Sequence, residues 1–80
     1  MFSGFSTDKI DLASFLMVSG VQLADVVETD PGEFTFIFPD LERSIKLATD
    51  FTNGALAPAW ELFKVKKYLI TRIKNAGGRY

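Results

Sequence analysis

The chain of 80 residues contains no cysteine and no histidine. Without cysteine it forms neither a disulfide framework nor a thiolate metal site. Without histidine it lacks the commonest general base and metal ligand, and with them every Ser-His or Cys-His arrangement for nucleophilic attack. Phosphate-binding loops of the GxxxxGK(S/T) or GxGxxG type are also absent. We therefore expect a protein that is not an enzyme and that uses no cofactor.

Long apolar runs are missing as well. No stretch approaches the roughly 18 apolar residues of a membrane span, and no basic leader followed by an apolar run marks a signal peptide. The lack of cysteine fits a reducing compartment. These absences predict a soluble cytoplasmic protein, and a length of 80 residues predicts a single domain over residues 1–80.

What the chain has in abundance is phenylalanine, with eight residues of this type. Aromatic side chains bury a large area while freezing few torsions, so they can give a short chain a stable core. Three of them alternate in residues 34–38, the clearest strand of the sequence. Alternating aromatics also occur in RNA-recognition sheets, but the basic residue that precedes them there is absent here. We expect Phe34, Phe36 and Phe38 to be core.

The first helix is expected over residues 9–19, after a short extended segment between Phe2 and Phe5. Ser6, Thr7 and Asp8 precede the helix, and their side-chain oxygens suit the free N–H groups of a first turn. Gly20 is expected to close it in the left-handed conformation. Its apolar residues form a broad helical stripe: Ile10, Leu12, Ala13, Phe15, Leu16 and Met17.

A hairpin is expected next, with strands at residues 21–29 and 34–38 joined by the Asp30–Glu33 turn, where proline and glycine suit the two central positions. Asp40 then caps a helix through about residue 51. We place the inner stripe of this helix at Leu41, Ile45, Ala48 and Thr52, with Leu47 and Phe51 beside it.

Asn53 and Gly54 end the second helix, and residues 55–57 form an extended link that can add an edge strand. Pro58 begins a closing helix to about Asn75, and residues 77–78 free the tail. The whole order predicts an α+β fold. An antiparallel hairpin sheet, with room for a short third strand, packs its phenylalanine face against three helices.

The chain resembles a family of small bacterial and phage proteins known only as a domain of unknown function. The resemblance spans nearly the whole chain and rests mostly on core and capping residues. It implies an α+β fold in a small stand-alone protein of phage origin, and it brings no known active site. The residues that carry it are 5–8, 12–16, Gly20, 34–38, 50–51, 53–54, Leu62 and Leu69.

The carboxylates offer only a weak case for a metal site. Asp8 and Asp11 are three residues apart and suit a hard cation such as Mg²⁺. Acidic side chains in a first helical turn more simply complement the helix dipole, and Asp30, Glu33 and Asp40 near the hairpin are most simply solvated turn residues. We expect no metal site.

Charge is distributed unevenly, because residues 1–59 carry a net charge of −6 and residues 60–80 a net charge of +5. On the closing helix, a helical wheel places Leu62, Val65, Leu69 and Ile73 toward the core, with Phe63 and Ile70 extending that face. The rest of the helix is our candidate partner-binding surface. It consists of Trp60, Lys64, Lys67, Tyr68, Thr71, Arg72 and Lys74.

Three interpretations of this surface stay open. The first is a protein-interaction module, which includes self-association through the last helix or the free hairpin edge and includes inhibition of a host enzyme. The second is a nucleic-acid accessory protein, against which the acidic pI of about 5.2 counts. The third is a solvated face, with Trp60 folded over the hairpin or the link. The nucleic-acid interpretation uses Lys64, Lys67, Arg72, Lys74 and Arg79.

Overall fold

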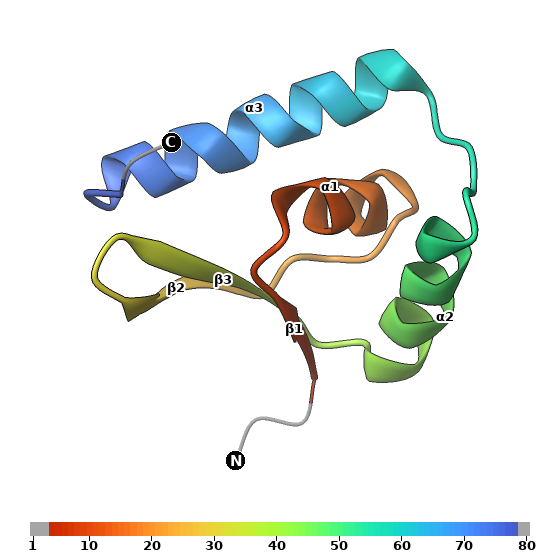
Figure 1. Ribbon diagram of the computed structural model, residues 1–80, viewed down its shortest axis with the longest axis horizontal. Helices are drawn as coiled ribbons and strands as arrows, with labels where there is room; N and C mark the ends of the chain where they lie inside the picture. Colours follow the sequence, from red (N-terminus) through yellow and green to blue (C-terminus); the bar gives the residue numbers. More distant parts are fainter. Residues whose placement is uncertain (1–3, 79–80) are drawn as a thin grey trace.

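The computed structural model describes residues 4–78, so Phe2 and Arg79 lie outside the described residues. Its elements follow the order expected from the sequence, and the predicted α+β class is confirmed (Figure 1). In this view α1 lies between α3 and the sheet, and α2 stands beside it. The elements are β1 (Phe5–Thr7), α1 (Ile10–Val18), β2 (Asp25–Asp30), β3 (Glu33–Phe38), α2 (Leu41–Thr52) and α3 (Ala59–Asn75).

The sheet is antiparallel with the strand order β1-β3-β2, so the phenylalanine strand is central. The expected hairpin joins β2 to β3, and Gly32 adopts the left-handed φ of 81° that the turn requires. Its first strand begins at Asp25 and not at residue 21. The reason is local: the Val21 N–H bonds the Leu16 carbonyl at 3.0 Å, which ties the start of this segment to the end of α1.

The core forms on one face of β3. Phe34, Phe36 and Phe38 are 8%, 1% and 0% exposed, as the alternation predicts. They pack with buried side chains of α1 and α3, among them Leu16 and Leu69. Because these three rings are covered, they are not available as a stacking platform for bases.

All three helices end in the same way. At the end of α1 the Gly20 N–H bonds the Met17 carbonyl and the Val21 N–H bonds the Leu16 carbonyl, a Schellman motif with Gly20 at φ 96°. The same pair of bonds recurs after α2 and after α3. The last of them holds residues 77–78 against the end of α3, and the tail that they were expected to free lies outside the described residues. The Gly78 N–H bonds the Ile73 carbonyl at 2.8 Å, and Gly78 lies against the Phe34 ring.

The helix starts were predicted with mixed success. Asp40 caps α2 as expected, because its carboxylate accepts a hydrogen bond from the Arg43 N–H at 3.2 Å. The prediction for α1 was right only in part: its N-cap is Lys9, and no side chain bonds the N–H groups of its first turn. Thr7 belongs to β1, where it pairs with Phe36, and its hydroxyl accepts a hydrogen bond from the Lys9 N–H at 3.1 Å, just before the helix.

The inner face of α2 was also wrongly predicted. Ser44 is fully buried, and the Phe51 ring lies 5.3 Å from the Phe15 ring of α1. Leu41 and Ile45 are 40% and 50% exposed instead. The helix therefore turns its aromatic residue toward α1, and this contact outweighs the longer aliphatic stripe.

The link after α2 forms no strand, which corrects the suggestion of an added edge there; its Leu56 is 97% exposed. The short β1 strand supplies the third strand of the sheet instead, paired with β3 from Phe5 opposite Phe38.

No helix within residues 4–78 is long and apolar enough to cross a membrane.

Candidate functional site

The closing helix α3 is built by ordinary helix signals. Pro58 stands at the N-cap, Glu61 lies in the first turn, and Arg72 and Lys74 lie in the last turn. Charges of this sign at these ends complement the helix dipole. These charges stabilise the two ends of the helix.

The predicted core face of α3 is largely confirmed. Leu69 and Ile73 are buried, and Leu62, Val65 and Ile70 are partly buried. Phe63 is the exception, because it is 56% exposed where we expected it to extend the core. It lies at the edge of the core face, where the elements of residues 4–78 leave more than half of it exposed.

Trp60 and Phe63 form an exposed aromatic pair. Trp60 is 64% exposed, and its ring stacks on that of Phe63 with the centroids 5.6 Å apart and the planes inclined by 20°. The Lys64 ammonium lies 5.9 Å from the Trp60 ring and 3.3 Å from the Glu61 carboxylate. Trp60 thus stays in solvent, so the third interpretation is wrong in folding Trp60 over the hairpin or the link, while its solvated lysine face stays a prediction.

An apolar groove of about 410 Å³ adjoins this pair. Phe63 and Leu62 of α3 and Phe51 of α2 form its apolar walls, and Ser14 of α1 also lines it. At its border Lys66 pairs with Asp11 at 2.9 Å. The sequence did not reveal this groove, because three separate helices contribute to it and no single helical pattern encodes their meeting.

The remaining candidate residues lie further along α3 or around it. Lys67 and Lys74 are exposed and form no ion pair within residues 4–78. Arg72 turns toward the sheet and lies 3.8 Å from Asp25 of β2. The Thr71 hydroxyl bonds the Lys67 carbonyl at 2.9 Å, and Tyr68 is 49% exposed. Of the seven predicted residues, Trp60 and Lys64 lie in the first half of the helix, which with Phe63 forms its aromatic half, Lys67 lies at the middle, and the other four lie in the second half.

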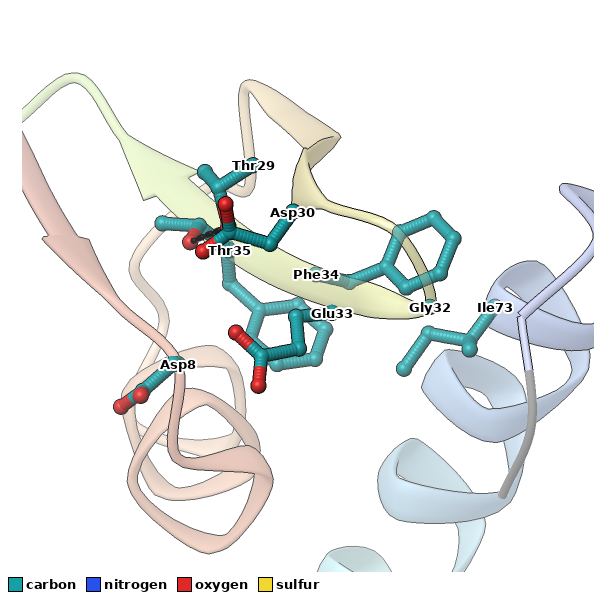
Figure 2. Close-up of a pocket in the computed structure, with 9 residues that line it drawn as sticks. Asp8, Thr29, Asp30, Gly32, Glu33, Phe34, Thr35 and Ile73 are labelled. Carbon is teal, nitrogen blue, oxygen red and sulfur yellow. Dashed lines mark hydrogen bonds between the residues drawn. The ribbon is translucent and has the colours of Figure 1, made fainter.

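A second hollow of about 400 Å³ lies at the hairpin end of the sheet, and it is acidic. Asp30 and Glu33 line it from the hairpin and Asp8 from the end of β1; Figure 2 shows Asp8 standing apart from the other two. Within residues 4–78 no group of three or more acidic side chains is placed to hold a metal ion. The aromatic half of α3 is therefore the stronger candidate site.

Comparison with known proteins identifies no relative: no family model matches the chain, and neither a curated protein nor a solved structure matches it. The resemblance to a domain of unknown function, with the bacterial or phage origin that it implies, stays a prediction. Support for a function therefore comes from the geometry of the described residues.

Proposed function

We propose that this protein is a non-enzymatic protein-interaction module that binds its partner through the first half of α3. The observation that carries the proposal is the exposed, stacked pair of Trp60 and Phe63 beside an apolar groove. Exposed tryptophan next to a pocket is typical of the residues that dominate binding energy at protein interfaces. Contiguous exposed apolar surface also marks interaction sites.

The same surface indicates the chemistry of the partner. The groove takes an aliphatic or aromatic side chain, since its walls are Phe51, Leu62 and Phe63. Lys64 and Lys67 lie on the exposed side of the helix next to the aromatic pair. Acidic side chains on the partner would meet these ammonium groups and speed the encounter. We expect a segment with one apolar anchor and acidic neighbours.

Selection of short random peptides against the folded protein tests this proposal. We expect the enriched peptides to combine an apolar anchor with acidic residues and to shift the emission of Trp60, the single tryptophan of the chain, as it is covered. Binding of a labelled peptide is then measured by fluorescence anisotropy on variants. Trp60→Ala and Phe63→Ala should each weaken it by about tenfold or more.

Tyr68→Ala is the matched control, because Tyr68 is a similarly exposed aromatic residue that does not line the groove. It should leave peptide affinity within about twofold of the original. Peptides that bind all three variants equally well would show that the aromatic pair is not the site. Thermal unfolding of each variant separates lost binding from lost folding.

A nucleic-acid accessory function is the second candidate. It is favoured by Lys67 and Lys74, which have no ion-pair partner within residues 4–78, on the same side of α3 as Trp60. A net charge of −1 for the whole chain weighs against it. Fluorescence anisotropy of a labelled single-stranded oligonucleotide distinguishes the two candidates. Micromolar binding that weakens with salt would support the nucleic-acid function, and no binding at low salt would exclude it.

A cytoplasmic location remains a prediction from the sequence.

A further inference from the structure

The helix α2 carries an apolar stripe that the fold leaves uncovered. Leu41 and Ile45 are 40% and 50% exposed, Ala48 is partly buried, and Thr52 is exposed. Their spacings of four, three and four residues place them in one line along the helix, the pattern of a helix-pairing seam. On the adjacent side of the helix Ser44 is buried and Phe51 packs against Phe15 of α1, so the seam and the core face are separate.

We propose that a second copy of this chain covers the seam, with the two α2 helices packed antiparallel about a twofold axis. This surface is distinct from the aromatic half of α3. When the axis passes midway between Ile45 and Ala48, every large residue meets a small one: Ile45 lies opposite Ala48 of the second copy, and Leu41 lies opposite Thr52. The stripe is thus complementary in size to its own reversed copy.

A groove beside α2 fits this arrangement. It has a volume of about 300 Å³ and lies between the second half of the helix and β1, with Phe5, Ala48 and Thr52 among its lining residues. In the antiparallel pair, Leu41 of the second copy arrives at the level of Thr52, which is where the groove lies. A leucine side chain there would cover the partly exposed Phe5 ring.

Charge favours a second copy at α2 and at no other uncovered surface described above. The outward side of α3 carries lysines, and the free edge of β2 carries Asp25, Glu28 and Asp30. Either surface placed against its own copy would bring like charges together. The helix α2 carries no net charge, because it has two acidic and two basic residues, and its Arg43 guanidinium bonds the Ser19 carbonyl at the end of α1 at 2.8 Å instead of lying at the seam. The four charged residues are Glu42, Arg43, Lys46 and Asp50.

The expected dimer is weak, since each helix of 12 residues offers a seam of only four. A contact of this size belongs with transient complexes, so we expect a dissociation constant on the order of 10–100 μM. Such a dimer would present two α3 surfaces at once and would strengthen binding to a divalent partner without a new contact.

Sedimentation equilibrium of the 80-residue chain tests the proposal over concentrations up to about 1 mM. We expect a reversible monomer–dimer equilibrium that Ile45→Glu weakens by about tenfold or more, because it buries a carboxylate in the seam. Leu56→Glu is the matched control, since Leu56 is exposed and lies outside the seam. A monomer at every concentration, or equal loss in both variants, overturns the proposal.

A pair of substitutions at Thr49 tests the antiparallel direction. Thr49 is exposed on the outer flank of the seam, and in the antiparallel pair it faces Glu42 of the second copy. Thr49→Lys should tighten the dimer severalfold at low salt and Thr49→Glu should loosen it, while both lose the same bond to the Ile45 carbonyl. In a parallel pair residue 49 would lie beside the uncharged Ser44 of the second copy and away from Glu42, so equal effects of the two substitutions overturn the antiparallel arrangement.

Discussion

Replacing Ser44 by alanine should stabilise this protein, and the reason lies in one hydroxyl group. Ser44 is fully buried in α2, and its hydroxyl has no hydrogen-bond partner within the described residues. Other helical hydroxyls bond the carbonyl four residues before them. These bonds are Ser14 to Ile10 at 2.8 Å, Thr49 to Ile45 at 3.0 Å, Thr52 to Ala48 at 3.0 Å and Thr71 to Lys67 at 2.9 Å.

The magnitude follows from what the substitution removes. A buried polar group without a partner costs about 1–3 kcal/mol, and alanine favours a helix over serine by a further few tenths of a kcal/mol, about 0.5 at most. Alanine keeps a small side chain at this fully buried position, so the packing loss is slight. We expect Ser44→Ala to raise the free energy of unfolding by about 1–2 kcal/mol, which in a domain of this size raises Tm by about 4–8 °C per kcal/mol.

Urea unfolding followed by circular dichroism measures this effect, with a higher midpoint and an unchanged slope expected. Ser14→Ala is the control, because Ser14 is equally buried but its hydroxyl bonds the Ile10 carbonyl. It should leave stability unchanged or lower it by about 1 kcal/mol. If Ser44→Ala destabilised the protein as much as Ser14→Ala does, the Ser44 hydroxyl would have to be satisfied in solution and the reasoning would fail.

Three other variants test the packing and the assigned faces of α3. Phe36→Ala should cost about 3–5 kcal/mol in urea unfolding, and a cost below about 1 kcal/mol would mean that the ring is not buried. Gly78→Ala should lower Tm measurably, because a Cβ there would collide with the Phe34 ring and with Ile73; an unchanged Tm would show that this chain end does not pack. Lys64→Glu combined with Lys67→Glu should change stability by no more than about 0.5 kcal/mol, since both side chains are exposed; a large thermal destabilisation would contradict the assigned faces of α3.

Local chemistry explains why most of the fold was readable from the sequence. The Pro31-Gly32 turn sets the hairpin, and the alternation in residues 34–38 leaves one arrangement that buries three phenylalanines. Gly20 and Gly54 mark helix ends because each supplies the left-handed residue of a Schellman motif. These signals act over a few residues, so they do not depend on distant parts of the chain.

The errors arose where two elements compete for a residue or meet far from each other in sequence. Thr7 suits a helix cap and also a strand. Its pairing with Phe36 of β3 places it in the strand β1. The helix α2 has two apolar stripes, and only the position of Phe15 on α1 shows that the Phe51 side faces inward. Phe63 could be recognised as exposed only once three helices were placed around the groove.

The place of β3 in the chain order has a consequence for synthesis in the cell. Its phenylalanines are covered partly by Leu69 and Ile73, about 35 residues later in the chain. At roughly 5–20 residues per second, the ribosome leaves this strand without its cover for about 2–7 s. A strand of this kind is prone to aggregate while it waits. Asp30, Glu33, Pro39 and Asp40 flank it closely, so the charges and the proline that shape the hairpin also keep the nascent chain from pairing with its neighbours.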